Sequence, residues 1–155
     1  MEFSLEELKN IDEIKSHYPE TKAALMPVLW LAQKKFGWIS NEVIEYVASL
    51  LNLSESHVKG VVSFYTMYFK KPMGKYHIQV CTNVSCMLNE GELIFEHISE
   101  KLGIKDMERS ADGKFSLEEV ECIGACGGAP VIAINEDYYE KVSIAQVDEI
   151  IDRLK

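Results

Sequence analysis

The sequence predicts an α/β protein in two parts, a helical bundle over residues 1–72 and a mixed sheet with packed helices over residues 73–155. In the first half, apolar residues recur every three or four positions, which is typical of amphipathic helices. After residue 74 the apolar period changes to two, which is typical of strands. Residues 70–74 carry turn-forming side chains and indicate the connection between the two parts.

Capping and helix-breaking residues mark the first two helices. Ser4 with Glu7 has the spacing of a capping box. This helix is expected to end near Pro19, because the residue before a proline avoids helical geometry. A second helix is expected over residues 20–36, with Pro27 either kinking it or marking its true start.

Two more helices are expected before the connection. Ser40 is placed to cap a third helix that ends near Leu51, and Ser54 is placed to cap a short fourth one. The following run, residues 60–69, has the composition of a strand, but periodicity alone cannot separate a short strand from a buried helix.

In the second half the expected order is strand, helix, strand, hairpin and helix. Alternating apolar residues predict a half-buried strand over Tyr76–Cys81, with Cys81 at its carboxyl end. Ser116 with Glu119 would also fit a helix cap, an alternative ranked below a strand at that position. The other expected elements are a helix over residues 89–102, a strand over 115–121, a hairpin of 131–134 with 138–142, and a last helix capped by Ser143 and Gln146.

Charge and hydropathy exclude several classes of function. A net charge of −9 argues against a nucleic-acid partner, because phosphates attract Lys and Arg. There is no apolar run of about eighteen residues or more, so no direct insertion into a membrane is expected. The acidic start differs from the basic and apolar start of a signal peptide. These features predict a cytoplasmic protein, in which disulfides are the less common use of cysteine.

All four cysteines lie in two close pairs, Cys81 with Cys86 and Cys122 with Cys126. Each pair is short enough to chelate one metal ion, and the 35 residues between the pairs are enough to fold and bring them together. Both pairs follow expected strands, and ligands of such sheets gather in loops beyond the carboxyl ends of strands. The four thiols are therefore the candidate ligands of a metal centre.

Three uses of these thiols compete. A dithiol oxidoreductase has two residues between its cysteines, and neither pair has that spacing. A structural zinc ion also takes four thiolates, although the first pair is at the loose end of the usual spacing. A 2Fe-2S cluster needs two thiolates on each of two irons, which two separated pairs supply. The spacing favours iron and sulfur, with zinc and free or disulfide-bonded thiols left open.

Three segments carry a resemblance to a known family: residues 60–68, residues 74–86, and residues 121–130, which contain Cys122-Ile-Gly-Ala-Cys126-Gly-Gly-Ala-Pro. They resemble the thioredoxin-like two-iron ferredoxins, and the likeness covers nearly the whole chain. It implies a thioredoxin-like domain after the helices, with Cys81 and Cys86 on one iron and Cys122 and Cys126 on the other. Many relatives have glycine where this chain has Glu90, with Gly91 next, which leaves the start of the following helix uncertain.

The resemblance also implies a partner. Members of this family pair with a larger flavoprotein that binds FMN and NADH, in respiratory complex I (NADH-quinone oxidoreductase) and in NAD-linked hydrogenases and formate dehydrogenases. It implies an electron-transfer subunit with no complete active site of its own, peripheral to a membrane only through its complex. Consistent with this, the sequence has no glycine-rich nucleotide loop. A zinc-stapled interaction module and a stand-alone ferredoxin are the alternatives.

Two further features have ordinary explanations. His77 shares a strand face with Cys81 and is a plausible neighbour of the metal centre, but four cysteines leave no need for it as a ligand. The aromatic run, residues 64–69, is expected to be core, although part of it could form the flavoprotein interface.

Overall fold

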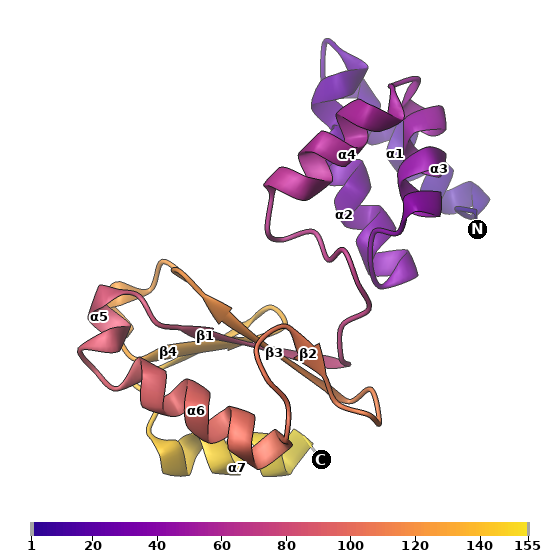
Figure 1. Cartoon of the computed structure of the whole chain (residues 1–155). Coiled ribbons are helices and arrows are strands. Elements are labelled where there is room, and N and C mark those ends of the chain that lie inside the picture. Colours follow the sequence, from indigo (N-terminus) through magenta and orange to yellow (C-terminus); the bar gives the residue numbers. More distant parts are fainter. Residues whose placement is uncertain (1, 155) are drawn as a thin grey trace. The chain divides into compact units, whose positions relative to one another are not determined.

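The computed structural model describes residues 2–154 and has the α/β fold class that the sequence predicts, with helices first and a mixed sheet after them (Figure 1). The chain divides into two units, the first ending at Pro72 and the second beginning at Met73. Each unit has its own apolar core. Within residues 2–154, no helix is both long and apolar enough to cross a membrane.

Three helices of the first unit begin where capping side chains satisfy free backbone N–H groups. Ser4 accepts a hydrogen bond from the N–H of Glu7, and Ser40 and Ser54 each accept one from the N–H three residues later. The three predicted caps are therefore confirmed. The helices are α1 (Leu5–Ser16), α2 (Leu25–Phe36), α3 (Asn41–Leu51) and α4 (Glu55–Phe64).

Pro27 marks the start of a helix and does not kink one. The expected helix over residues 20–36 is divided into a short 3-10 helix, Thr21–Ala24, and α2. Pro27 is the third residue of α2, and an N–H in the first turn of a helix has no partner within the helix. The missing N–H of proline therefore costs α2 no hydrogen bond.

The ambiguous run over residues 60–69 forms no strand. Its first half completes α4, which ends at Phe64, and its second half is an irregular segment. Gln33 of α2 satisfies the backbone of this segment: its side chain donates to the carbonyl of Met67 at 2.8 Å and accepts from the N–H of Phe69 at 2.6 Å. The strand-like composition does not decide the conformation here, because the amide of Gln33 takes the place of a neighbouring strand.

Part of the aromatic run is core, as predicted. Tyr68 is fully buried, and its hydroxyl donates to the carbonyl of Met26 at 2.9 Å. By contrast, Phe64 is 78% exposed and Met67 is 42% exposed. The rest of the core of this unit comes from the inner faces of the helices, and its fully buried members include Ile11, Leu25, Val28, Leu29, Val43, Val47, Leu51 and Val58.

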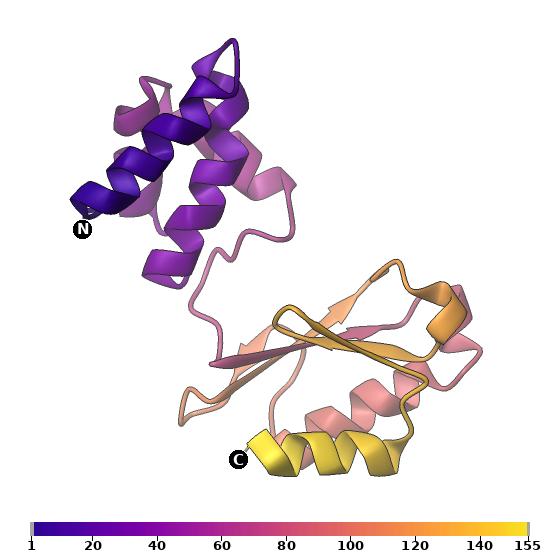
Figure 2. The same cartoon turned by 180° about the vertical axis from the view of Figure 1, so that it is seen from behind.

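The second unit is built on a five-stranded mixed sheet in the order β2-β3-β1-β4-β5 (Figures 1 and 2). β1 is central, parallel to β3 and antiparallel to β4. The predicted strands and hairpin are confirmed, whereas the alternative helix cap at Ser116 is wrong and two-residue β2 was not predicted. The strands are β1 (Tyr76–Cys81), β2 (Glu108–Arg109), β3 (Phe115–Val120), β4 (Val131–Ile134) and β5 (Asp137–Glu140).

Helices α6 (Gly91–Leu102) and α7 (Ile144–Leu154) lie on one face of this sheet (Figures 1 and 2). The sheet residues that point toward them form the core of the unit and include Ile78, Val80, Leu117, Ile132 and Ile134. The predicted cap of the last helix is confirmed, because Ser143 accepts from the N–H of Gln146.

The helix expected over residues 89–102 begins two residues later than predicted. A separate short helix, α5 (Val84–Met87), comes first, and Glu90 then adopts a left-handed conformation with φ of 67°. A left-handed residue interrupts a right-handed helix, so α5 and α6 cannot be continuous.

Glu7 joins α1 to α2. Its carboxylate accepts a hydrogen bond from the N–H of Ser4 at 2.6 Å and forms an ion pair with Lys35 of α2. The hydrogen bond from Lys35, helped by the one from Ser4, lowers the pKa of Glu7 from 4.5 to about 2. A carboxyl group whose pKa falls on folding stabilises the folded state above its unfolded pKa, and this contribution disappears as the pH falls toward its folded pKa.

We therefore expect Glu7→Gln to unfold with a weaker dependence on pH between 4.5 and 2 than the wild type. Urea unfolding, followed by circular dichroism at several pH values, measures this difference. Lys35→Gln, which removes the main cause of the lowered pKa of Glu7, should weaken the pH dependence in the same way. An equal pH dependence of the free energy of unfolding in Glu7→Gln and wild type would contradict the lowered pKa of Glu7.

Candidate metal centre

The first cysteine pair is buried at the carboxyl end of β1. Cys81 is the last residue of β1, and Cys86 lies in α5, whose first N–H is capped by the side chain of Asn83. Cys81 is 4% exposed and Cys86 is 2% exposed. Both pack with Val131 in a small apolar cluster separate from the main core of the unit. The sheet therefore places this pair beneath the surface.

The second pair lies in the loop after β3 and is exposed. Cys122 follows β3 by two residues, and Cys126 begins a 3-10 turn, Cys126–Gly128. Gly124 between them has φ of 86°, a left-handed conformation that favours glycine, and its N–H donates to Sγ of Cys122 at 3.3 Å. The loop thus directs a backbone donor at one of its own thiols.

Parallel pairing of β1 with β3 brings the two pairs to one edge of the sheet. Cys81 is in register with Val120, and the N–H of Thr82 donates to the carbonyl of Val120 at 3.3 Å. Because parallel strands end at the same edge, the loops that carry the two pairs begin side by side. The sequence predicted both pairs at strand ends; the structure places Cys81 within β1, Cys86 in α5 and the second pair in the loop after β3.

Burial keeps Cys86 in the thiol form. Loss of solvent, followed by a hydrogen bond with Cys81, raises the pKa of Cys86 to about 11, and the N–H of Val131 partly opposes this shift. The charges of Cys81 and Cys126 also raise the pKa, so the second pair acts electrostatically on the first. A thiol must lose its proton to bind a metal, and the bound cation would then balance the negative charge of the thiolate.

Gly91 allows α6 to begin against the first pair. A Cβ at this position would lie 2.7 Å from the carbonyl oxygen of Cys81 and 2.9 Å from that of Cys86. Both contacts are with backbone, which cannot move aside without displacing the cysteines. The sequence places Gly91 one position after the glycine of many relatives and does not explain why this position is glycine. The close approach of Gly91 to the backbone of Cys81 and Cys86 explains it.

The donor set fits a 2Fe-2S cluster. All four cysteines are free, so each thiol is available as a ligand. Two thiolates for each of two irons is the ligand set of this cluster. The N–H groups of Gly124 and Val131, directed at sulfur, are the donors that stabilise thiolate ligands.

His77 is engaged elsewhere. It is buried, with Nδ1 at 2.9 Å from Oγ of Ser116 and Nε2 at 2.9 Å from Oε2 of Glu118. Gln79 donates to the same carboxylate oxygen at 2.9 Å. Both ring nitrogens therefore have partners on the neighbouring strand, and His77 supports the sheet near the cysteines without acting as a ligand.

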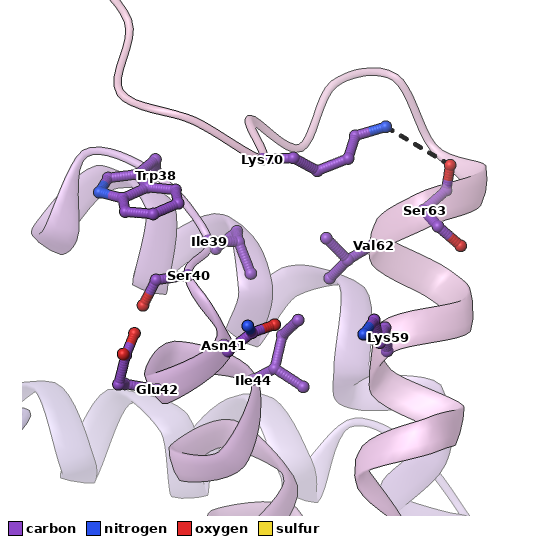
Figure 3. Close-up of a pocket in the computed structure, with 10 residues that line it drawn as sticks. All are labelled: Trp38, Ile39, Ser40, Asn41, Glu42, Ile44, Lys59, Val62, Ser63 and Lys70. Atoms are coloured by element: carbon purple, nitrogen blue, oxygen red, sulfur yellow. Dashed lines mark hydrogen bonds between the residues drawn. The ribbon is translucent and has the colours of Figure 1, made fainter.

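The first unit has an open pocket of about 310 Å³ between the start of α3 and one face of α4 (Figure 3). Lys70 reaches across its rim and donates to the carbonyl of Ser63 at 3.5 Å. The lining residues include no cysteine or histidine, so this pocket takes no part in the candidate metal centre. They are Trp38, Ile39, Ser40, Asn41, Glu42, Ile44, Lys59, Val62, Ser63 and Lys70.

Residues 11–155 match the family model of the thioredoxin-like 2Fe-2S ferredoxins. The chain belongs to this family. A subunit of NADH-quinone oxidoreductase from Rickettsia bellii is 48% identical over 146 residues, which cover 93% of this chain and 87% of the relative. The corresponding subunit from Rhizobium meliloti is 37% identical over 147 residues, covering 95% and 88%. The resemblance stated from the sequence is confirmed.

A solved structure shares the fold. An NAD+-reducing NiFe hydrogenase in its H2-reduced state aligns with a TM-score of 0.74 and 20% identity, over 84% of this chain. The chain corresponds to only 22% of that hydrogenase chain. At this identity the likeness shows the fold alone, a helical region followed by a thioredoxin-like domain.

The difference in burial between the two pairs predicts an order of reaction. We expect iodoacetamide to alkylate Cys122 and Cys126 of the metal-free protein at least about tenfold faster than Cys86, because the thiolate is the reactive form and the raised pKa keeps Cys86 protonated. Mass spectrometry of peptides taken at successive times measures the order. In urea the difference should vanish, and equal rates in the native protein would contradict the buried placement of Cys86.

Proposed function

We propose that this chain is an electron-transfer subunit that carries one 2Fe-2S cluster beside a larger flavoprotein binding FMN and NADH, as part of an NADH-quinone oxidoreductase. The observation that carries the proposal is the pair of cysteine loops at one edge of the sheet, in a chain of this family. In its complex the subunit would be peripheral to the membrane.

In this proposal Cys81 and Cys86 hold one iron, and Cys122 and Cys126 hold the other. The cluster would supply one-electron chemistry, which a flavin needs because a hydride brings two electrons at once. The protein contributes the two N–H donors to sulfur, from Gly124 and Val131, and an apolar enclosure around the first pair. The exposed second pair leaves one side of the site open to a partner.

An apolar surface beside the first pair supports a protein partner at this edge. Two side chains of α5 and that of the next residue are exposed: Val84 by 59%, Met87 by 45% and Leu88 by 77%. We call these three residues the α5 patch. A cluster of exposed apolar side chains on a soluble domain typically marks an interaction site. Its position next to Cys86 would bring the partner close to the cluster.

Charge around the α5 patch favours a different chain over a second copy. Residues 76–100 and 115–140 contain no Lys or Arg, and Glu90 and Glu92 directly follow the patch. Two copies facing each other would oppose one acidic rim to another, which is unfavourable. A flavoprotein with an apolar contact face and a rim of Lys and Arg would be complementary in both respects.

The names of the relatives support the choice of parent enzyme. Those cited above are named as subunits of NADH-quinone oxidoreductase, and they are covered over 87–88% of their length. An NAD-linked hydrogenase is the second candidate, because the hydrogenase structure has the same fold over most of this chain. The protein that co-purifies with the chain distinguishes these two cases.

Metal analysis tests the cluster itself. Protein purified without oxygen should contain two irons and two sulfides per chain and show a two-iron spectrum on reduction. Cys86→Ala should lose this spectrum, because alanine has no ligand atom. Stoichiometric zinc without iron or sulfide in the wild type would contradict the proposal and favour a zinc-stapled interaction module. An unchanged spectrum in Cys86→Ala would refute the assignment of Cys86 as a ligand.

The α5 patch is tested by a change of charge. We expect Leu88→Glu to weaken binding to the co-expressed flavoprotein by about tenfold or more while the iron content stays that of the wild type, because a carboxylate would be buried at the contact. The matched control is Leu5→Glu on α1, where the wild-type leucine is 82% exposed. Equal binding by Leu88→Glu and wild type would place the interface elsewhere.

A further inference from the structure

Glu140, the last residue of β5, lies against a neighbour of each cysteine pair, Val131 and Gly128. In the β4–β5 ladder it is directly opposite Val131, the residue that packs against Cys81 and Cys86. Residues directly opposite each other in an antiparallel pair have their side chains on the same face, with Cβ atoms about 5 Å apart. The side chain of Glu140 is therefore on the face of the sheet that carries the buried pair.

The same side chain lies against the turn that carries Cys126. A Cβ at Gly128 would lie 2.6 Å from Cγ of Glu140 and would overlap its carboxylate group. The N–H of Lys141 donates to the carbonyl of Gly128 at 2.7 Å, which fixes the end of β5 against the turn Cys126–Gly128. Glycine at position 128 thus leaves the space that the carboxylate occupies.

Nothing in the described part of the chain neutralises this carboxylate. The side chain of Glu140 forms no hydrogen bond and no ion pair within residues 2–154, and Lys141, the next residue, does not pair with it. Residues 115–140 include no Lys or Arg that could do so. A carboxylate without a partner, held against the loop of a metal centre, acts on that centre through its charge.

We propose that Glu140 lowers the reduction potential of the cluster. The inference rests on the proposed function, since it requires the cluster to be present. Reduction adds one electron to the cluster, and no bond forms or breaks at Glu140. The added negative charge is repelled by the carboxylate, which favours the oxidised form. The reduced flavin of the partner would be the electron donor, and a lower potential makes the cluster a weaker acceptor.

The exposure of the Glu140 side chain limits the size of the shift in reduction potential. Glu140 is exposed, so water and salt screen part of its charge. We therefore expect a shift of about three- to fivefold in the ratio of reduced to oxidised cluster at a given ambient potential. A tenfold shift is 59 mV for one electron, so threefold corresponds to about 28 mV.

The test is a redox titration of the full chain, purified without oxygen and followed by electron paramagnetic resonance. Glu140→Gln should raise the midpoint potential by the amount above. Glu140→Ala should also raise it, so that one of the two variants still tests the inference if the other binds the cluster poorly. Glu140→Asp, which keeps the charge, should stay closer to the wild type. Raising the salt concentration should reduce the difference between Glu140→Gln and wild type.

The matched control is Asp137→Asn, which removes the same charge from the other end of β5, about 10 Å further along the strand. It should change the potential by less than half as much. An intact cluster with the wild-type potential in both Glu140→Gln and Glu140→Ala would overturn the inference, as would an equal shift in Asp137→Asn. A wild-type protein without iron and sulfide would instead overturn the proposed function.

Discussion

The candidate metal centre depends on the parallel pairing of β1 with β3. Cys81 ends β1, the loop with Cys122 and Cys126 follows β3, and the register sets Cys81 beside Val120. If β1 slipped by one residue, its side chains would exchange faces and Cys81 would turn toward α6 and α7. The apolar side chains that pack beneath those helices, such as Ile78 and Leu117, therefore also determine where the thiols lie.

Close backbone approaches complete the arrangement. At Gly91 and Gly128 a side chain would collide, in the first case with the carbonyl groups of the inner cysteines and in the second with the carboxylate of Glu140. The two thiol pairs have different surroundings: the inner pair is enclosed by apolar side chains and the outer pair is open to solvent.

Much of the fold could be predicted from local chemistry. Ser4, Ser40, Ser54 and Ser143 begin helices because their side chains satisfy nearby N–H groups, and this depends only on neighbouring residues. The errors came where distant contacts decided the conformation. Residues 65–69 have strand-like composition, but Gln33 satisfies the backbone there, and α5 is too short to give a periodic signal.

By itself, the sequence identified the four candidate ligands and the family, because cysteine spacing and the motifs around it are local properties of the chain. It also determined that both cysteine pairs follow strands. Only the tertiary structure decided which pair is buried, why Gly91 must be glycine, and that Glu140 lies against the turn of Cys126. These features depend on contacts between residues far apart in the chain, and no local sequence pattern predicts such contacts.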